Sequence, residues 1–171
     1  MTPAMMEDPE EAKNFNLTAF LDRNSKEIRY PEISTGAIEL KKEHGFKKVG
    51  EIGFCYGGWV VFRLGAKSNP LVDCISMAHP SGMTEAEIEA VGVPVQILAP
   101  ENDPMLTPEL KAFCNKTIPA LGVEYDYQYF PSLVHGFATR GDMKDPVQKK
   151  GLERAKDAAV HWFQTVSHLN T

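Results

Sequence analysis

A glycine-rich turn around a cysteine constrains the fold of this chain more than any other feature. An apolar stretch over 49–54 runs into the sequence Gly-Phe-Cys-Tyr-Gly-Gly at 53–58 and then into a helical pattern. Strand, sharp turn and helix would place Cys55 on a strained backbone, with Gly53 and Gly57 leaving room for the helix to pack on the strand. We therefore expect Cys55 at a helix N-terminus, where the partial positive charge favours a thiolate.

Apolar runs and helical patterns alternate along the rest of the chain. This alternation predicts an α/β fold with a mostly parallel sheet and helices on both faces. The last strand alternates polar and aromatic residues, so we place it at a sheet edge. We expect strands over 49–54, 71–78, 93–99 and 124–130, and helices over 33–44, 59–66, 107–122 and 146–168, with a short helix after Thr84.

Two of these helices have an apolar stripe that predicts their buried face. Residues 1–31 read as an irregular or partly helical lead-in broken by Pro31, and 131–145 as a long loop. We expect one domain over 1–171. The predicted stripes are Ile33, Ala37, Ile38 and Leu40 in the first helix, and Leu152, Ala155, Ala159, Trp162, Phe163 and Val166 in the last.

Three residues that could carry chemistry follow predicted strands, namely Cys55, Asp103 and His135. Right-handed crossovers bring the C-terminal ends of parallel strands to one edge, which is where ligand sites lie. A thiol nucleophile needs a base, and the base needs an orienting acceptor. The order nucleophile, acid, histidine is that of α/β-hydrolase triads, and the backbone N–H of Tyr56 would then stabilise an oxyanion.

Each of these residues has an alternative reading. Cys55 could be a small buried residue, as we expect for Cys74 and Cys114 in a strand and a helix. Glu101 competes with Asp103 as the acid, and His79 competes with His135, although its neighbour Pro80 favours a structural or pocket-lining role for His79. We expect a mostly apolar pocket lined by Tyr56, Trp59, His79, Met83, Met105 and Phe137.

Composition excludes several other classes of function. The 171 residues carry a net charge of −5, which argues against nucleic acid and anionic membranes as partners. Apolar runs stay shorter than the roughly 20 residues of a membrane span. Three cysteines without paired spacing indicate free thiols and a cytoplasmic protein. The spacings typical of metal ligands and of a dinucleotide fingerprint are absent, so we expect neither a metal nor a cofactor.

The chain resembles the dienelactone hydrolase family of α/β-hydrolases from about Ile33 onward. The resemblance rests on the motif at 53–58, the His79-Pro80 pair, the acid loop at 100–104 and the sequence His-Gly-Phe at 135–137. It implies Cys55 as nucleophile, His135 as general base and Asp103 as orienting acid. It also implies an enzyme that opens lactones or cleaves activated esters through an acyl-thioester, without a cofactor.

The same resemblance implies that the fold is incomplete at its N-terminal side. The first strands, the loop with the second oxyanion donor, a glutamate that contacts the resting thiol and the basic residues for a substrate carboxylate would be missing. The strand at 49–54 would then be an open edge able to pair with a second copy. Loss of one oxyanion donor costs about 100-fold or more, so we expect weak or absent activity. The alternatives are a non-catalytic binding or assembly module, a redox-sensitive thiol protein, and an acyltransferase.

Overall fold

The computed structural model describes residues 16–168, which divide after Ile33 into two units. A single domain over 1–171 stays a prediction. The first unit contains α3 (Leu17–Arg23) and the beginning of α4 (Lys26–Lys42), which ends in the second unit. The second unit, over 34–171, contains the sheet and the cysteine turn.

The described part of the lead-in is helical. Asn16 is the N-cap of α3, and its side chain accepts a hydrogen bond from the N–H of Ala19. α4 starts seven residues before the expected start at residue 33 and contains Pro31, so the expectation that Pro31 breaks the pattern is wrong. A proline inside a helix costs one backbone hydrogen bond but does not always end the helix. Residues 1–15 of the lead-in lie outside the described residues.

The buried stripe expected for α4 is mostly wrong. Ala37 is the buried residue of this helix, whereas Ile33 and Ile38 are half-buried and Leu40 is exposed. Charged residues are spread around the helix instead of being confined to one face, as the run Glu-Leu-Lys-Lys at 39–42 illustrates. Spacing alone therefore overstated the apolar face of α4.

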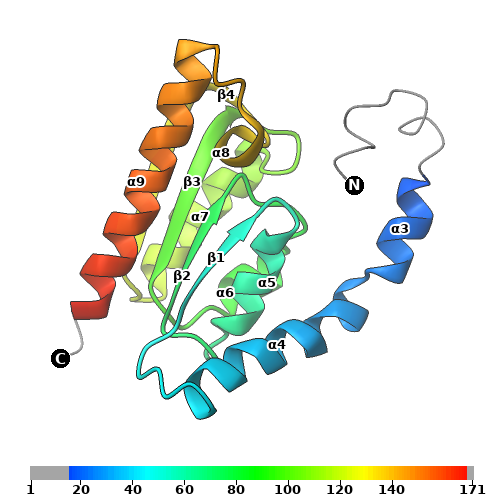
Figure 1. The fold of residues 1–171 in the computed structure, drawn as a ribbon, viewed down its shortest axis with the longest axis vertical. Helices are drawn as coiled ribbons and strands as arrows, with labels where there is room; N and C mark the ends of the chain where they lie inside the picture. Colours follow the sequence, from blue (N-terminus) through cyan, green and yellow to red (C-terminus); the bar gives the residue numbers. More distant parts are fainter. Residues whose placement is uncertain (1–15, 169–171) are drawn as a thin grey trace. The chain divides into compact units, whose positions relative to one another are not determined.

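The sheet of the second unit is parallel throughout its described strands, as predicted (Figure 1). Its strand order follows the chain, so the first and last strands are the edges. The nearly continuous apolar run over 71–78 gives a strand that is buried along its whole length. The strands are β1 (Gly50–Phe54), β2 (Cys74–Ala78), β3 (Val95–Asn102) and β4 (Tyr125–Val134).

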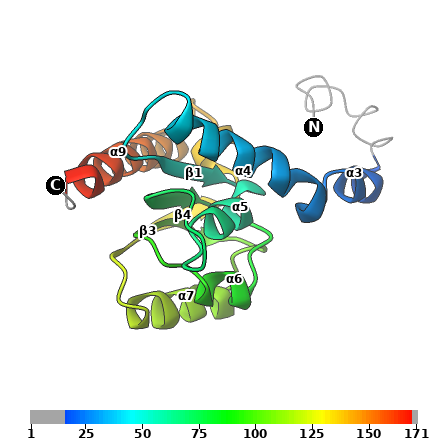
Figure 2. The same cartoon turned by 90° about the horizontal axis from the view of Figure 1, so that it is seen from below.

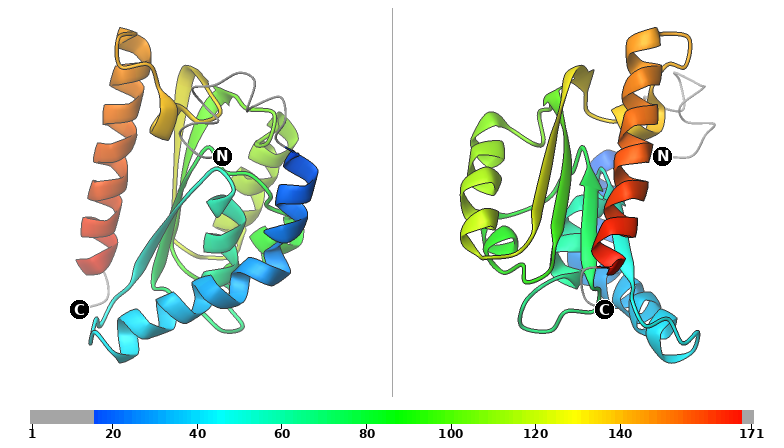
Figure 3. Two further views of the ribbon diagram at one scale, coloured as in Figure 1. Left: turned by 45° about the vertical axis from the view of Figure 1, so that its right-hand side comes forward. Right: turned by 90° about the vertical axis from the view of Figure 1, so that its left-hand side faces the viewer.

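Helices cover both faces of this sheet. Figure 2 and the right-hand view of Figure 3 show α9 against one face and α6 and α7 on the other. α6 begins with the predicted capping box between Thr84 and Glu87. The helices are α5 (Gly57–Leu64), α6 (Glu85–Glu89), α7 (Pro108–Ala120), α8 (Phe137–Arg140) and α9 (Pro146–His168).

β4 extends four residues beyond its expected end at 130, and part of the expected loop over 131–145 is the short helix α8. The extension includes Pro131, which an edge strand tolerates because one side of it needs no ladder hydrogen bond. The pairing with β3 shifts register between Pro100 and Asn102, and Ser132 has a φ of 61°. These irregularities mark a bulge, and bulges re-aim the residues that follow them.

Most of the core face predicted for α9 is confirmed. Ala155, Ala159, Trp162 and Val166 are buried, whereas Leu152 and Phe163 are half-buried. The indole N–H of Trp162 donates a hydrogen bond of 3.1 Å to the carbonyl of Ile75 in β2. This bond satisfies a buried polar group and ties the helix to the sheet. α9 is the longest described helix, and within the described residues neither it nor any other helix is long and apolar enough to span a membrane.

Candidate active site

The turn between β1 and α5 holds Cys55 in a conformation that few side chains adopt. Its φ is 49°, as expected for a cysteine on a strained turn. The carbonyl of Cys55 accepts hydrogen bonds from the N–H groups of Gly58 and Ser81, at 3.0 and 2.8 Å. These contacts tie the turn both to α5 and to the loop after β2, so the thiol is presented from a fixed backbone.

Of the two glycines expected to leave room for the helix, the structure confirms Gly53 but not Gly57. A Cβ at Gly53 would clash with the carbonyl of Gly57, so Gly53 permits the close approach of strand and helix. A Cβ at Gly58 would clash with Pro80. No described atom lies within 4 Å of a Cβ built on Gly57. The packing therefore requires Gly53 and Gly58, whereas at Gly57 a Cβ meets no obstacle.

Asp103 and His135 are in direct contact beside this turn. The Nδ1 atom of His135 lies 3.0 Å from both carboxylate oxygens of Asp103. The side chain of Asp103 is fully buried and accepts further hydrogen bonds from the N–H groups of Met105 and Leu106. The carboxylate is therefore fixed, and it orients the imidazole with Nε2 directed away from it.

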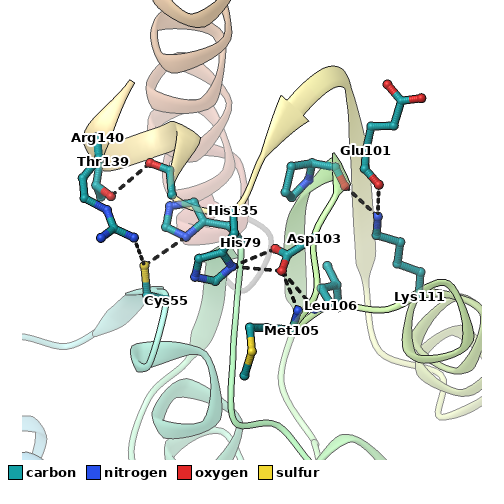
Figure 4. Close-up of polar contacts among 12 residues, drawn as sticks. Cys55, His79, Glu101, Asp103, Met105, Leu106, Lys111, His135, Thr139 and Arg140 are labelled. Atoms are coloured by element: carbon teal, nitrogen blue, oxygen red, sulfur yellow. Dashed lines mark hydrogen bonds and ion pairs between the residues drawn. The ribbon is translucent and has the colours of Figure 1, made fainter. Parts of the chain in front are cut away.

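Glu101, the rival acid, has a different set of contacts. Its carboxylate accepts a hydrogen bond from the N–H of Ser132. Its carbonyl accepts one from the ammonium of Lys111, as Figure 4 shows. The first contact joins Glu101 to the bulge of β4, and the second joins it to α7. Of the two candidate acids, Asp103 is the one that contacts His135.

His79 lies closer to the thiol than a pocket-lining role would require. Its Nδ1 atom is 3.3 Å from the Sγ atom of Cys55, and its ring centroid is 5.1 Å from that of His135. The ring is fully buried, and its Nε2 atom has no hydrogen-bond partner among the described residues. Burial, together with the neighbouring His135, lowers the pKa of His79 to about 4, so the ring is neutral near pH 7.

The pKa of the Cys55 thiol is raised above its ordinary value, mainly by burial. The nearby carboxylate of Asp103 raises it further, whereas the guanidinium of Arg140 lowers it from 3.9 Å away. The expectation that the helix N-terminus favours a thiolate is therefore outweighed by desolvation. In the resting site the 3.3 Å contact between Sγ and Nδ1 of His79 therefore joins a neutral thiol to a neutral ring.

Figure 4 shows the polar groups of the site side by side, with Arg140 at one end and Asp103 at the other. The ligand atoms of Cys55, His79 and His135 all lie within 4.8 Å of one another. One thiol and two imidazoles are also a set of donors for a transition metal. A chain of acid, imidazole and thiol can carry out proton transfer and nucleophilic attack.

The expected pocket residues lie at different depths around these groups. Trp59 is fully buried in α5, with Tyr56 against its edge and the guanidinium of Arg63 over its ring. Phe137 is buried and packs edge-on against His79, and Met105 is half-exposed. Tyr56 directly follows the thiol as the N-cap of α5, and its role as an oxyanion donor stays a prediction.

Two contacts of the site were missed from the sequence. The sequence pattern indicates no role for Arg140, because it predicts a loop over 131–145 where the structure has the short helix α8. The one available signal was its position five residues after His135. The contact between His79 and Cys55 was also missed, although both residues follow neighbouring strands, β1 and β2.

Comparisons with known proteins agree on one family. A sequence model of the dienelactone hydrolase family matches residues 7–167. "Hydrolase tropI" of Talaromyces stipitatus is 28% identical over 133 residues, which cover 78% of this chain and 52% of that protein. "Dienlactone hydrolase 1" of Gibberella moniliformis is 25% identical over 153 residues, covering 88% of this chain and 58% of that protein.

The fold is shared with solved structures of the same kind. The crystal structure of a dienelactone hydrolase-like promiscuous phosphotriesterase from metagenomic libraries superposes with a TM-score of 0.66 at 17% identity. The match covers 87% of this chain and 66% of that one. The chain spans about half the length of the two curated fungal relatives, so its sheet corresponds to part of a larger α/β-hydrolase fold.

Proposed function

Because the chain belongs to the dienelactone hydrolase family, we propose that it cleaves a small lactone or ester at Cys55, with His135 as general base and Asp103 as its orienting acid. The observation that carries this proposal is the pair of 3.0 Å contacts between His135 and Asp103 beside the strained cysteine turn. A buried carboxylate that holds one ring nitrogen leaves the other as a base.

The proposed reaction has two halves. In the first, Nε2 of His135 accepts the thiol proton as Sγ of Cys55 attacks the substrate carbonyl, and the backbone N–H of Tyr56 stabilises the oxyanion. The leaving oxygen takes the proton from His135, giving an acyl-thioester. In the second, His135 removes a proton from water, which attacks the thioester and releases the carboxylic acid and the free thiol.

The resting geometry requires one rearrangement before attack. The thiol hydrogen-bonds His79, whereas the base must be His135, so Cys55 has to change partner. The donor atoms of these three residues are within 4.8 Å of one another, a distance that rotation about the single χ angle of the cysteine can close. Catalytic hydrogen bonds are often long before substrate binds. Arg140 would then lie beside the thiolate and favour its formation.

Turnover of p-nitrophenyl acetate and of small lactones by the purified chain tests this proposal. We expect Cys55→Ala and His135→Ala to abolish turnover above the buffer rate, a loss on the order of 10⁴-fold or more in kcat. His161→Ala is the matched control, because His161 is an exposed histidine on α9. The control should retain the activity of the wild-type chain.

The other classes of function predict different results. A non-catalytic module or a redox-sensitive thiol would show alkylation of Cys55 by electrophiles with no turnover of any ester or lactone. An acyltransferase would form product only when an acceptor nucleophile is added. Either result would overturn the hydrolase. β1 is an edge of the sheet among the described strands. The pairing of β1 with a second copy stays a prediction. Measurement of the molecular mass in solution tests whether the chain forms a dimer.

A further inference from the structure

Three side chains with metal-binding atoms converge from different parts of the chain. Cys55 follows β1, His79 follows β2 and His135 follows β4, and their ligand atoms lie within 4.8 Å of one another. Cys55 and His79 are 24 residues apart in the sequence. The short spacings by which metal sites are recognised therefore could not reveal this cluster. The parallel sheet brings the three residues together at one edge.

The distances are close to those of a metal site. A tetrahedral zinc ion with bonds of about 2.0–2.1 Å to nitrogen and 2.3 Å to sulfur places its ligand atoms roughly 3.3–3.7 Å apart. The Sγ atom of Cys55 and the Nδ1 atom of His79 are already separated by 3.3 Å. Closing the remaining pairs requires at most about 1.5 Å of movement, which small rotations of the cysteine and histidine side chains can supply.

The contacts of His135 also fit a metal ligand. His135 is held at Nδ1 by the carboxylate of Asp103. A carboxylate on the far nitrogen is the arrangement that orients metal-binding histidines in proteins.

We propose that Cys55, His79 and His135 bind one thiophilic divalent transition-metal ion, for which Zn²⁺ is the probe. Sγ of Cys55 binds the ion as a thiolate and releases its proton to solvent, and no electron is transferred. Three protein ligands leave a fourth position for water. The bound ion occupies both the sulfur and the base, so it blocks the nucleophile reversibly. This regulatory consequence rests on the proposed hydrolase function, whereas the binding itself does not.

Arg140 provides a second test, in which a substitution should strengthen metal binding and not weaken it. Its guanidinium lies 3.9 Å from the Sγ atom, where a positive charge repels an incoming cation. Arg140 is exposed, so the side chain can move aside, and its removal does not disturb the core. Arg140→Ala should therefore bind Zn²⁺ more tightly than the wild-type chain, by several-fold.

The experiment titrates the metal-free chain with Zn²⁺ by calorimetry and with Co²⁺ by absorption spectroscopy, because a sulfur-to-cobalt charge-transfer band reports a thiolate ligand. We expect one ion per chain, a charge-transfer band, and protection of Cys55 from iodoacetamide that a chelator reverses. Cys55→Ser should lose the band, and His79→Asn and His135→Asn should each weaken binding at least tenfold. His161→Asn, the exposed control, should bind as the wild-type chain does.

The proposal is overturned if His79→Asn binds as tightly as the wild type, if Cys55→Ser keeps the band, or if Arg140→Ala weakens binding. Circular dichroism shows whether the His79 variant has folded. If it has not, the binding of Zn²⁺ by His135→Asn and Arg140→Ala tests the proposal. Ester turnover is measured separately in chelator. Absence of turnover there refutes the proposed hydrolase and leaves the metal result standing, whereas turnover without metal binding refutes this site alone.

Discussion

The imidazole of His135 lies 3.0 Å, at its Nδ1 atom, from both carboxylate oxygens of Asp103. Two backbone N–H groups fix the carboxylate in turn, those of Met105 and Leu106. Asp103 follows β3 and His135 follows β4, so neighbouring strands of one sheet supply the pair. The pair is rigid because β3 and β4, the strands that the two residues follow, are hydrogen-bonded to each other.

Asp103→Asn should lower kcat for ester turnover by about 10³–10⁴-fold, because the amide would hold His135 in the wrong tautomer. The structure of the loop should be little changed, since an amide oxygen can still accept the two backbone N–H groups. Glu101→Gln is the control at the adjacent end of β3 and should retain most of the activity, because Glu101 contacts Ser132 and not His135. Equal losses in the two variants would contradict this role for Asp103.

Cys55 should behave as a protected thiol rather than as an activated one. Burial raises the pKa of Cys55, so its alkylation by iodoacetamide should be slower at pH 7 than that of a free cysteine and should accelerate only at alkaline pH. Arg140→Ala removes the charge that lowers this pKa, so the profile should move further to alkaline pH. Rates measured by mass spectrometry of the Cys55 peptide test both statements. A profile that does not move in Arg140→Ala would show that the guanidinium has no effect on the thiol.

The sequence pattern predicted those elements whose structure depends on neighbouring residues in the chain. The continuous apolar run before His79 gave a buried parallel strand, and the stripe from Ala155 to Val166 gave the sheet-facing side of α9. The glycine pattern around Cys55 predicted a strained turn, because glycine is the residue that permits close backbone approach. The contact between Asp103 and His135 followed from the parallel topology and from both residues lying after strands.

Other features depend on tertiary contacts that no local pattern encodes. β4 tolerates Pro131 and the bulge near Ser132 because it is an edge strand. The strand therefore continues past Pro131, and α8 follows it and carries Arg140. The contact between Cys55 and His79 depends on the positive φ angles of both residues, 49° and 39°. The raised pKa of the thiol likewise reflects burial, which the helix N-terminus alone did not predict.

The stability of the chain should fall in mildly acidic solution because of His79. The pKa of His79 is about 4 in the folded chain, against an ordinary value near 6.5, so the unfolded chain binds a proton first as pH falls. The contribution is fully present above pH 6.5 and is lost progressively down to pH 4, by roughly 3 kcal/mol. His79→Asn should show a flatter dependence of the urea midpoint on pH, whereas the exposed control His161→Asn should keep the wild-type slope. An unchanged slope in His79→Asn would place the acid sensitivity elsewhere.

The two adjacent glycines that begin α5 should respond in opposite ways to the same substitution. A methyl group at Gly58 would clash with the ring and Cα of Pro80, which are backbone-bound and cannot turn away. Gly58→Ala should therefore destabilise the chain by about 1–3 kcal/mol and slow ester turnover, because the loop of His79 must shift. At Gly57 no described atom lies within 4 Å of the added Cβ, and alanine favours a helix by up to about 1 kcal/mol over glycine. Gly57→Ala should be neutral or slightly stabilising. Urea denaturation of both variants measures the difference, and a larger loss in Gly57→Ala than in Gly58→Ala would contradict the packing of α5 against the loop after β2.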